Sequence, residues 1–106
     1  MKPLLWRGST RKDLSLFPAE ARRQSGYQLR RVQEGLAPAD WKPMPTIGPG
    51  VREIRVQDGV SAWRIIYLCE RPEGIYVLHA FQKKTQKTSQ RDIQLARERF
   101  RMIGRP

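Results

Sequence analysis

The chain has 106 residues, and its 21 lysines and arginines outnumber 10 aspartates and glutamates, which gives a formal charge of +11. This length predicts a single domain, residues 1–106, and a hydrophobic content of 39% is enough for a core, which excludes disorder throughout. The positive charge predicts a polyanionic partner, either a nucleic acid or an acidic protein.

The first part of the chain predicts a short strand and a short helix. Residues 4–6 are apolar, as is typical of a strand. Ser9 or Thr10 then caps a helix that turns Leu14 and Phe17 inward.

A second helix is predicted from Pro18, whose fixed φ suits the first helical turn. Its apolar positions recur at three- and four-residue spacing and form one buried stripe. The stripe consists of Ala21, Ser25, Leu29 or Gln28, Val32 and Leu36. Gly35 is the expected C-cap, and residues 36–50 are rich in proline and glycine, which predicts an ordered loop.

From residue 51 the apolar period changes to two, which predicts three antiparallel strands. The strands are residues 51–57, 62–70 and 75–81, with a tight turn at Asp58-Gly59.

The last helix is predicted to begin near Ser89, whose hydroxyl caps it together with Asp92 three residues later. Its buried stripe is Ile93, Ala96, Phe100 and Ile103. The fold class is therefore α+β, in the order β-α-α-β-β-β-α, with the helices packed on one face of a small antiparallel meander.

The sequence offers no pattern for a metal or a nucleotide cofactor, and we expect neither. His79 and Cys69 are the only histidine and cysteine, and zinc motifs, a Walker loop and a Rossmann glycine pattern are all missing. His79 lies in an apolar strand, where a hydrogen-bonded structural role is expected. No run is long enough for a membrane span, and no signal-peptide core follows Met1, so we expect a cytoplasmic protein.

The segment 81–89 carries Lys83, Lys84 and Lys87 where a strand leads into a helix. Backbone N–H groups and the helix dipole favour an anion at such a junction. The three lysines therefore predict a phosphate site.

Arg55 and Arg64 lie on adjacent strands and are expected to converge with Lys83 and Lys84 if both project to the open face of the sheet. RNA can be cleaved without a metal, because its own 2′-OH attacks the neighbouring phosphorus. Lys83 or Lys84 is a candidate base, with a pKa lowered by neighbouring cations.

Two further residues on these strands are given other roles. Tyr67 is three residues from Arg64, so regular alternation places it on the opposite face. Glu53 is expected to be a strand-face partner for one of the arginines.

Three segments in a fixed order carry a family resemblance: REIR at residues 52–55, RIIY at 64–67 and FQKKTQKT at 81–88. Together they resemble the phage-derived HigB-like branch of the RelE/ParE toxin superfamily. The resemblance covers most of the chain and is densest from 51 to 103. It implies the toxin half of a type II toxin–antitoxin pair, and many relatives are metal-free, ribosome-dependent endoribonucleases that cleave mRNA.

The resemblance also assigns roles to the basic residues. Arg64, Lys84 and Lys83 are predicted to be catalytic. Arg55, Lys87 and Arg91 are predicted to bind the nucleic acid. Several relatives have a tyrosine, or acidic and histidine residues, near the C-terminal end, whereas this chain has Ser89-Gln90-Arg91-Asp92 there. The acid and base are therefore not assigned.

The implied partners are a HigA-like helix-turn-helix antitoxin, the ribosome and its mRNA, with operator DNA bound only through the antitoxin complex. Two other functions remain open. A ParE-type toxin of the same superfamily inhibits DNA gyrase, and a small RNA-binding module would bind RNA without cleaving it.

Overall fold

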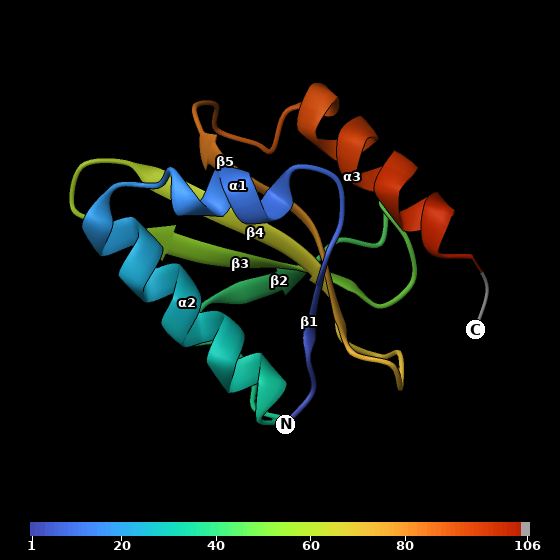
Figure 1. The fold of residues 1–106 in the computed structure, drawn as a ribbon. Helices are drawn as coiled ribbons and strands as arrows, with labels where there is room; N and C mark the ends of the chain where they lie inside the picture. Colours follow the sequence, from blue (N-terminus) through green and yellow to red (C-terminus); the bar gives the residue numbers. More distant parts are fainter. Residues whose placement is uncertain (105–106) are drawn as a thin grey trace.

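In the computed structural model, which describes residues 1–104, the chain forms a five-stranded mixed sheet and three helices (Figure 1). The elements are β1 (Leu4–Trp6), α1 (Thr10–Ser15), α2 (Ala19–Gln33), β2 (Trp41–Pro43), β3 (Val51–Gln57), β4 (Ala62–Leu68), β5 (Ile75–Lys83) and α3 (Gln90–Ile103). The strand order across the sheet is β1-β5-β4-β3-β2. The predicted α+β class is confirmed.

The sheet differs from the predicted meander at its two edges. β3, β4 and β5 are antiparallel as expected, but β1 joins the sheet parallel to β5. β2 lies inside the region predicted to be a loop and pairs antiparallel with β3, so that Lys42 aligns with Glu53. Pro43 is compatible with β2 because an edge strand does not need every backbone N–H.

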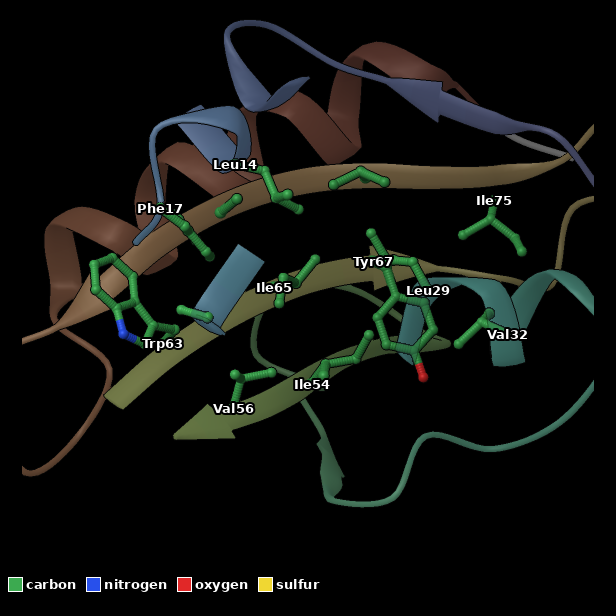
Figure 2. Close-up of a cluster of buried hydrophobic side chains, with 13 residues drawn as sticks. Leu14, Phe17, Leu29, Val32, Ile54, Val56, Trp63, Ile65, Tyr67 and Ile75 are labelled. Atoms are coloured by element: carbon green, nitrogen blue, oxygen red, sulfur yellow. The ribbon is translucent and has the colours of Figure 1, made fainter. Parts of the chain in front are cut away.

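The helices lie on both faces of the sheet, so the prediction of one helical face was wrong. α1 and α2 cover the face that carries Ile65 and Tyr67, as Figure 2 shows for the cluster around these residues. α3 covers the other face, over Ile66 and Leu68. Figure 1 shows α2 and α3 far apart with the central strands between them. Because β4 is apolar on both sides, both sides need cover from water.

α2 ends two residues before Gly35, which adopts the expected left-handed conformation with φ 84°. The Gly35 N–H donates to the Val32 carbonyl and the Leu36 N–H to the Arg31 carbonyl, which is a Schellman motif. Leu36 therefore lies outside the helix and is half exposed, not part of the buried stripe as predicted.

The N-caps of α3 and α1 differ in whether the serine hydroxyl bonds to the helix backbone. Ser89 accepts a hydrogen bond from the Asp92 N–H at 3.2 Å, which confirms the predicted start of α3. Ser9 precedes α1, but its hydroxyl donates to the Asp13 carboxylate and makes no capping bond to the backbone. None of the helices formed by residues 1–104 has the length and hydropathy needed to cross a membrane.

The character of the α3 face changes along the strands, and this change positions the site. Where α3 covers it, the face is apolar, with Leu68 and Leu78 among its buried residues. Further along β3, β4 and β5 the same alternation brings Glu53, Arg64 and Lys83 to this face.

Candidate nucleic-acid interface

Charged side chains from four adjacent strands meet on the α3 face of the sheet. The register places Lys42 opposite Glu53, and Arg55 opposite Arg64. Lys83 lies on β5, close enough for its pKa to be affected by the charges of these four residues. We call this group the sheet cluster; it consists of Lys42, Glu53, Arg55, Arg64 and Lys83. Four cations surround one carboxylate, so the cluster has a net positive charge.

Glu53 is the carboxylate of the sheet cluster and is 1% exposed. Its Oε1 atom lies 3.6 Å from Arg64 Nε, which confirms that Glu53 partners an arginine. Its Oε2 atom accepts a hydrogen bond of 2.6 Å from the Thr88 hydroxyl. A buried carboxylate needs such partners, because burial without them is costly. Glu53 therefore joins the sheet to the segment that precedes α3.

Arg64 is 6% exposed, and its Nη1 atom donates to the Trp63 carbonyl at 2.9 Å. Burial lowers the pKa of Arg64, and the charge of Glu53 opposes this effect. Within residues 1–104, the buried Nε atoms of Arg64 and Arg55 have no hydrogen-bond partner. Buried donors are normally satisfied. Arg64 Nε still faces the Glu53 carboxylate at 3.6 Å, so within residues 1–104 it is the Arg55 Nε that has neither a hydrogen bond nor an ion pair and is suited to an anion.

Lys83 has the electrostatic setting of a base. Burial, followed by the charge of Arg64, lowers the pKa of Lys83 below the ordinary lysine value of 10.5. Glu53 acts in the opposite direction. A lowered pKa increases the fraction of neutral amine that can accept a proton. The direction of the pKa shift agrees with the prediction for Lys83, but its largest cause is burial and not the neighbouring cations that the sequence suggested.

Lys84 and Arg91 are placed apart from the sheet cluster. They line a hollow of about 400 Å³ between the end of β5 and the start of α3, which we call the helix-start hollow. Its lining residues are His79, Gln82, Lys84, Thr85, Ser89, Arg91, Asp92 and Leu95. The sequence predicted that Lys83 and Lys84 act on one phosphate, which stays a prediction; of the two, Lys84 lines this hollow and Lys83 is in the sheet cluster.

Lys87 lies on the other side of the same loop. It lines a hollow of about 360 Å³ together with Lys42 and Thr88. Lys87 therefore borders the sheet cluster through Lys42, and its role in binding stays a prediction. Lys42 itself was missed, because it lies between prolines in a region where the sequence shows no strand periodicity.

His79 and Asp92 form a pair at the base of the helix-start hollow. His79 Nε2 lies 2.7 Å from Asp92 Oδ1, so the predicted hydrogen-bonded histidine is confirmed. Burial lowers the pKa of His79, and this effect outweighs the opposing hydrogen bond to Asp92. Asp92 also accepts from the Ser89 hydroxyl at 2.7 Å. The Asp92 carboxylate thus holds both the capping hydroxyl of Ser89 and a side chain of β5.

Tyr67 lies away from the cluster, as alternation predicted. It is fully buried in the core under α2, and burial raises the pKa of its phenol to about 12 (Figure 2). In residues 1–104, no three or more His, Cys, Asp and Glu side chains are grouped so that they could hold a metal ion. The chemistry that the described site offers is that of guanidinium and ammonium groups around a buried carboxylate.

The comparison with protein families covers the parts of the chain that build this site. The family model described as Phage derived protein Gp49-like matches residues 12–101, which include every residue of the sheet cluster. A search of the curated proteins found none that matches this sequence. The chain therefore belongs to the Gp49-like family of phage-derived proteins, which is associated with RelE/HigB-like toxins.

Proposed function

We propose that this protein is the toxin of a type II toxin–antitoxin pair and acts in the cytoplasm as a ribosome-dependent mRNA endoribonuclease that needs no metal. The observation that carries the proposal is the sheet cluster, in which four cationic donors lie around one buried carboxylate and the Arg55 Nε atom has no hydrogen-bond partner within residues 1–104. A phosphate suits these donors in charge and in geometry. The family assignment and the HigB-like sequence resemblance support a toxin.

In the proposed reaction the RNA supplies its own nucleophile. The 2′-oxygen attacks the adjacent phosphorus, the bond to the 5′-oxygen breaks, and a 2′,3′-cyclic phosphate and a 5′-hydroxyl result. Arg55 and Arg64 stabilise the charge of the five-coordinate transition state. Neutral Lys83 accepts the proton of the 2′-hydroxyl. We assign the proton for the leaving 5′-oxygen to Lys42, the other ammonium group of the sheet cluster.

The proposed partners follow from the charge and from the resemblance. A protein with a formal charge of +11 associates quickly with the polyanionic ribosome and with acidic segments of an antitoxin. We propose a HigA-like helix-turn-helix antitoxin, which would bring the complex to operator DNA.

The decisive experiment is expression of the chain without its antitoxin, followed by mapping of mRNA 5′ ends. New 5′ ends inside translated codons, together with growth arrest, are the expected result. Growth arrest with intact transcripts and gyrase-bound cleaved DNA would instead identify a ParE-type inhibitor. RNA binding without new 5′ ends would identify a non-catalytic module.

A further inference from the structure

Phe81 is an aromatic side chain at the margin of the sheet cluster. In the β4–β5 register it lies directly opposite Arg64, and it precedes Lys83 by two residues on the same face of β5. Its ring is only partly buried. Aromatic surface therefore borders two of the cations to which the proposed function assigns the reacting phosphate.

The ring of Phe81 is held in place by His79 and by the apolar cluster under α3. It stacks on His79, with 4.4 Å between the ring centroids and 20° between the planes. His79 is in turn fixed by Asp92, which is 2.7 Å from its Nε2 atom. His79, Phe81 and Lys83 alternate along one face of β5, so the side of the ring turned away from His79 faces Lys83. Phe81 is partly exposed, and the Lys83 side of its ring is the side next to the cations.

Three of the other aromatic residues lie on the opposite face of the sheet. Trp63 and Tyr67 are buried in the core on the opposite face of the sheet. Tyr27 is 58% exposed, but it lies on α2, which covers that opposite face.

We propose that Phe81 is a nucleobase-stacking subsite, in which the base beside the scissile phosphate stacks on the ring while His79 and Asp92 hold the ring in position. The inference rests on the proposed RNA-cleaving function and deepens it. Every nucleobase has a π-face, so such a platform positions the nucleotide without selecting its sequence. Fixing the base restrains the ribose, and so keeps the attacking 2′-oxygen in line with the phosphate between Arg64 and Lys83.

The test uses 2-aminopurine, a fluorescent base that is quenched when it stacks. It is placed in turn at each nucleotide around the cut found by 5′-end mapping, in an mRNA with a 2′-O-methyl group on the attacking ribose to block cleavage. The mRNA is presented both free at low salt and in programmed ribosomes. With the wild-type protein we expect quenching at a nucleotide that flanks the cut.

Variants at Phe81 separate stacking from packing. Phe81→Leu keeps an apolar side chain of similar volume but removes the ring, so quenching should disappear and RNA affinity should fall by about 5- to 100-fold. Phe81→Tyr keeps the ring and should keep the quenching. Tyr27→Leu is the matched control, because it removes an exposed aromatic ring from the opposite face and should change neither quantity.

The outcomes distinguish this inference from the proposed function. The wild-type protein could bind and cleave RNA without quenching 2-aminopurine at any position, either in free mRNA or in programmed ribosomes. In that case the stacking subsite is wrong and the nuclease proposal stands. If Phe81→Leu folds, as far-ultraviolet circular dichroism shows, and still quenches, the subsite is again overturned. If that variant does not fold, the wild-type scan and Phe81→Tyr decide the question. If the wild-type protein neither binds nor cleaves RNA, both proposals fail together.

Discussion

Thr88 donates a 2.6 Å hydrogen bond to Glu53, a residue that is 35 positions earlier in the chain. Both side chains are buried, and Glu53 also lies against Arg64. This bond fastens the lysine-bearing segment that follows β5 to the charged part of β3. The sheet cluster and the entrance to α3 are therefore one structural unit.

Loss of the Thr88 hydroxyl should destabilise the protein. Thr88→Val has nearly the same shape but leaves Glu53 Oε2 buried without its donor, so the free energy of unfolding should fall by about 1–3 kcal/mol. Urea unfolding monitored by circular dichroism measures the change. Thr88→Ser keeps a hydroxyl and should lose much less. Equal losses in the two variants would show that the methyl group, not the hydrogen bond, matters.

Removal of the Arg64 guanidinium should abolish most of the toxicity. Arg64→Ala should lower the rate of mRNA cleavage by about 10²–10³, by analogy with the loss of one oxyanion donor. Arg64→Lys keeps a positive charge beside Glu53 but loses the planar fork, and should restore the rate only in part. Growth arrest and 5′-end counts report the effect. Arg30→Ala, an exposed arginine paired with Glu34 on α2, should remain fully toxic.

Lys84 should also contribute to toxicity, but by less than Lys83. It lines the helix-start hollow and not the sheet cluster, so its ammonium group is suited to holding a neighbouring part of the RNA. Lys84→Ala should therefore weaken mRNA binding more than it slows cleavage of bound mRNA. Single-turnover cleavage at saturating protein separates the two quantities. A larger loss of rate for Lys84→Ala than for Lys83→Ala would overturn this division.

The pH dependence of cleavage should report the neutral fraction of Lys83. Its pKa is lowered by burial and by Arg64, so the rate should rise with pH and level off below the ordinary lysine value of 10.5. Lys83→Arg stays protonated and should lack this rise. Because Glu53 raises the pKa of Lys83, Glu53→Gln should move the rise to lower pH. Identical profiles for wild-type protein and Lys83→Arg would remove Lys83 as the base.

The stability of the fold should fall on mild acidification because of His79. Burial lowers its pKa below 6.5, against the opposing effect of Asp92 and, more weakly, of Asp13, while Arg99 adds to the lowering. Between the ordinary pKa of 6.5 and the lower folded pKa, the unfolded chain binds the proton more readily than the folded chain. The contribution of His79 to stability is therefore fully present above pH 6.5 and is lost as the pH falls through the folded pKa. His79→Gln should flatten the loss of stability as the pH falls below 6.5, measured by urea unfolding. A wild-type protein that gains stability there would contradict the sign.

RNA binding should weaken as salt rises. If about four phosphates are contacted, the log–log slope for single-stranded RNA should be near −3. Arg55→Gln removes one cation and should make the slope less steep by about 0.7. Fluorescence anisotropy of a short labelled RNA at several salt concentrations measures both slopes. A flat response would argue against the basic surface as the RNA-binding site.

Local patterns in the sequence were enough for most of the elements. The period of two after residue 50 predicted β3, β4 and β5, and the Ser89 cap predicted the start of α3. These signals depend on neighbours in the chain, so they can be seen without the fold. β2 could not be predicted in this way, because three residues that include a proline form a strand only when β3 supplies a pairing edge.

The same distinction applies to the charged residues. The hairpin between β3 and β4 is local, so alternation was enough to pair Arg55 with Arg64 and to place Tyr67 on the opposite face. The association of Lys42 with Glu53 depends on the edge strand. The contact of His79 with Asp92 depends on how α3 packs across β5, next to an irregularity in the β4–β5 register.

The sequence by itself determined that this is a small basic α+β protein of toxin-like pattern, with lysines at the entrance to its last helix. Only the tertiary structure decided which of those lysines shares a site with the arginines. Lys83 still belongs to the strand and follows its alternation onto the face of Arg64. Lys84 follows the end of β5 and lines the hollow beside α3. The end of β5 lies between these two adjacent residues, and the position of that end depends on how β5 pairs with β4 and packs against α3.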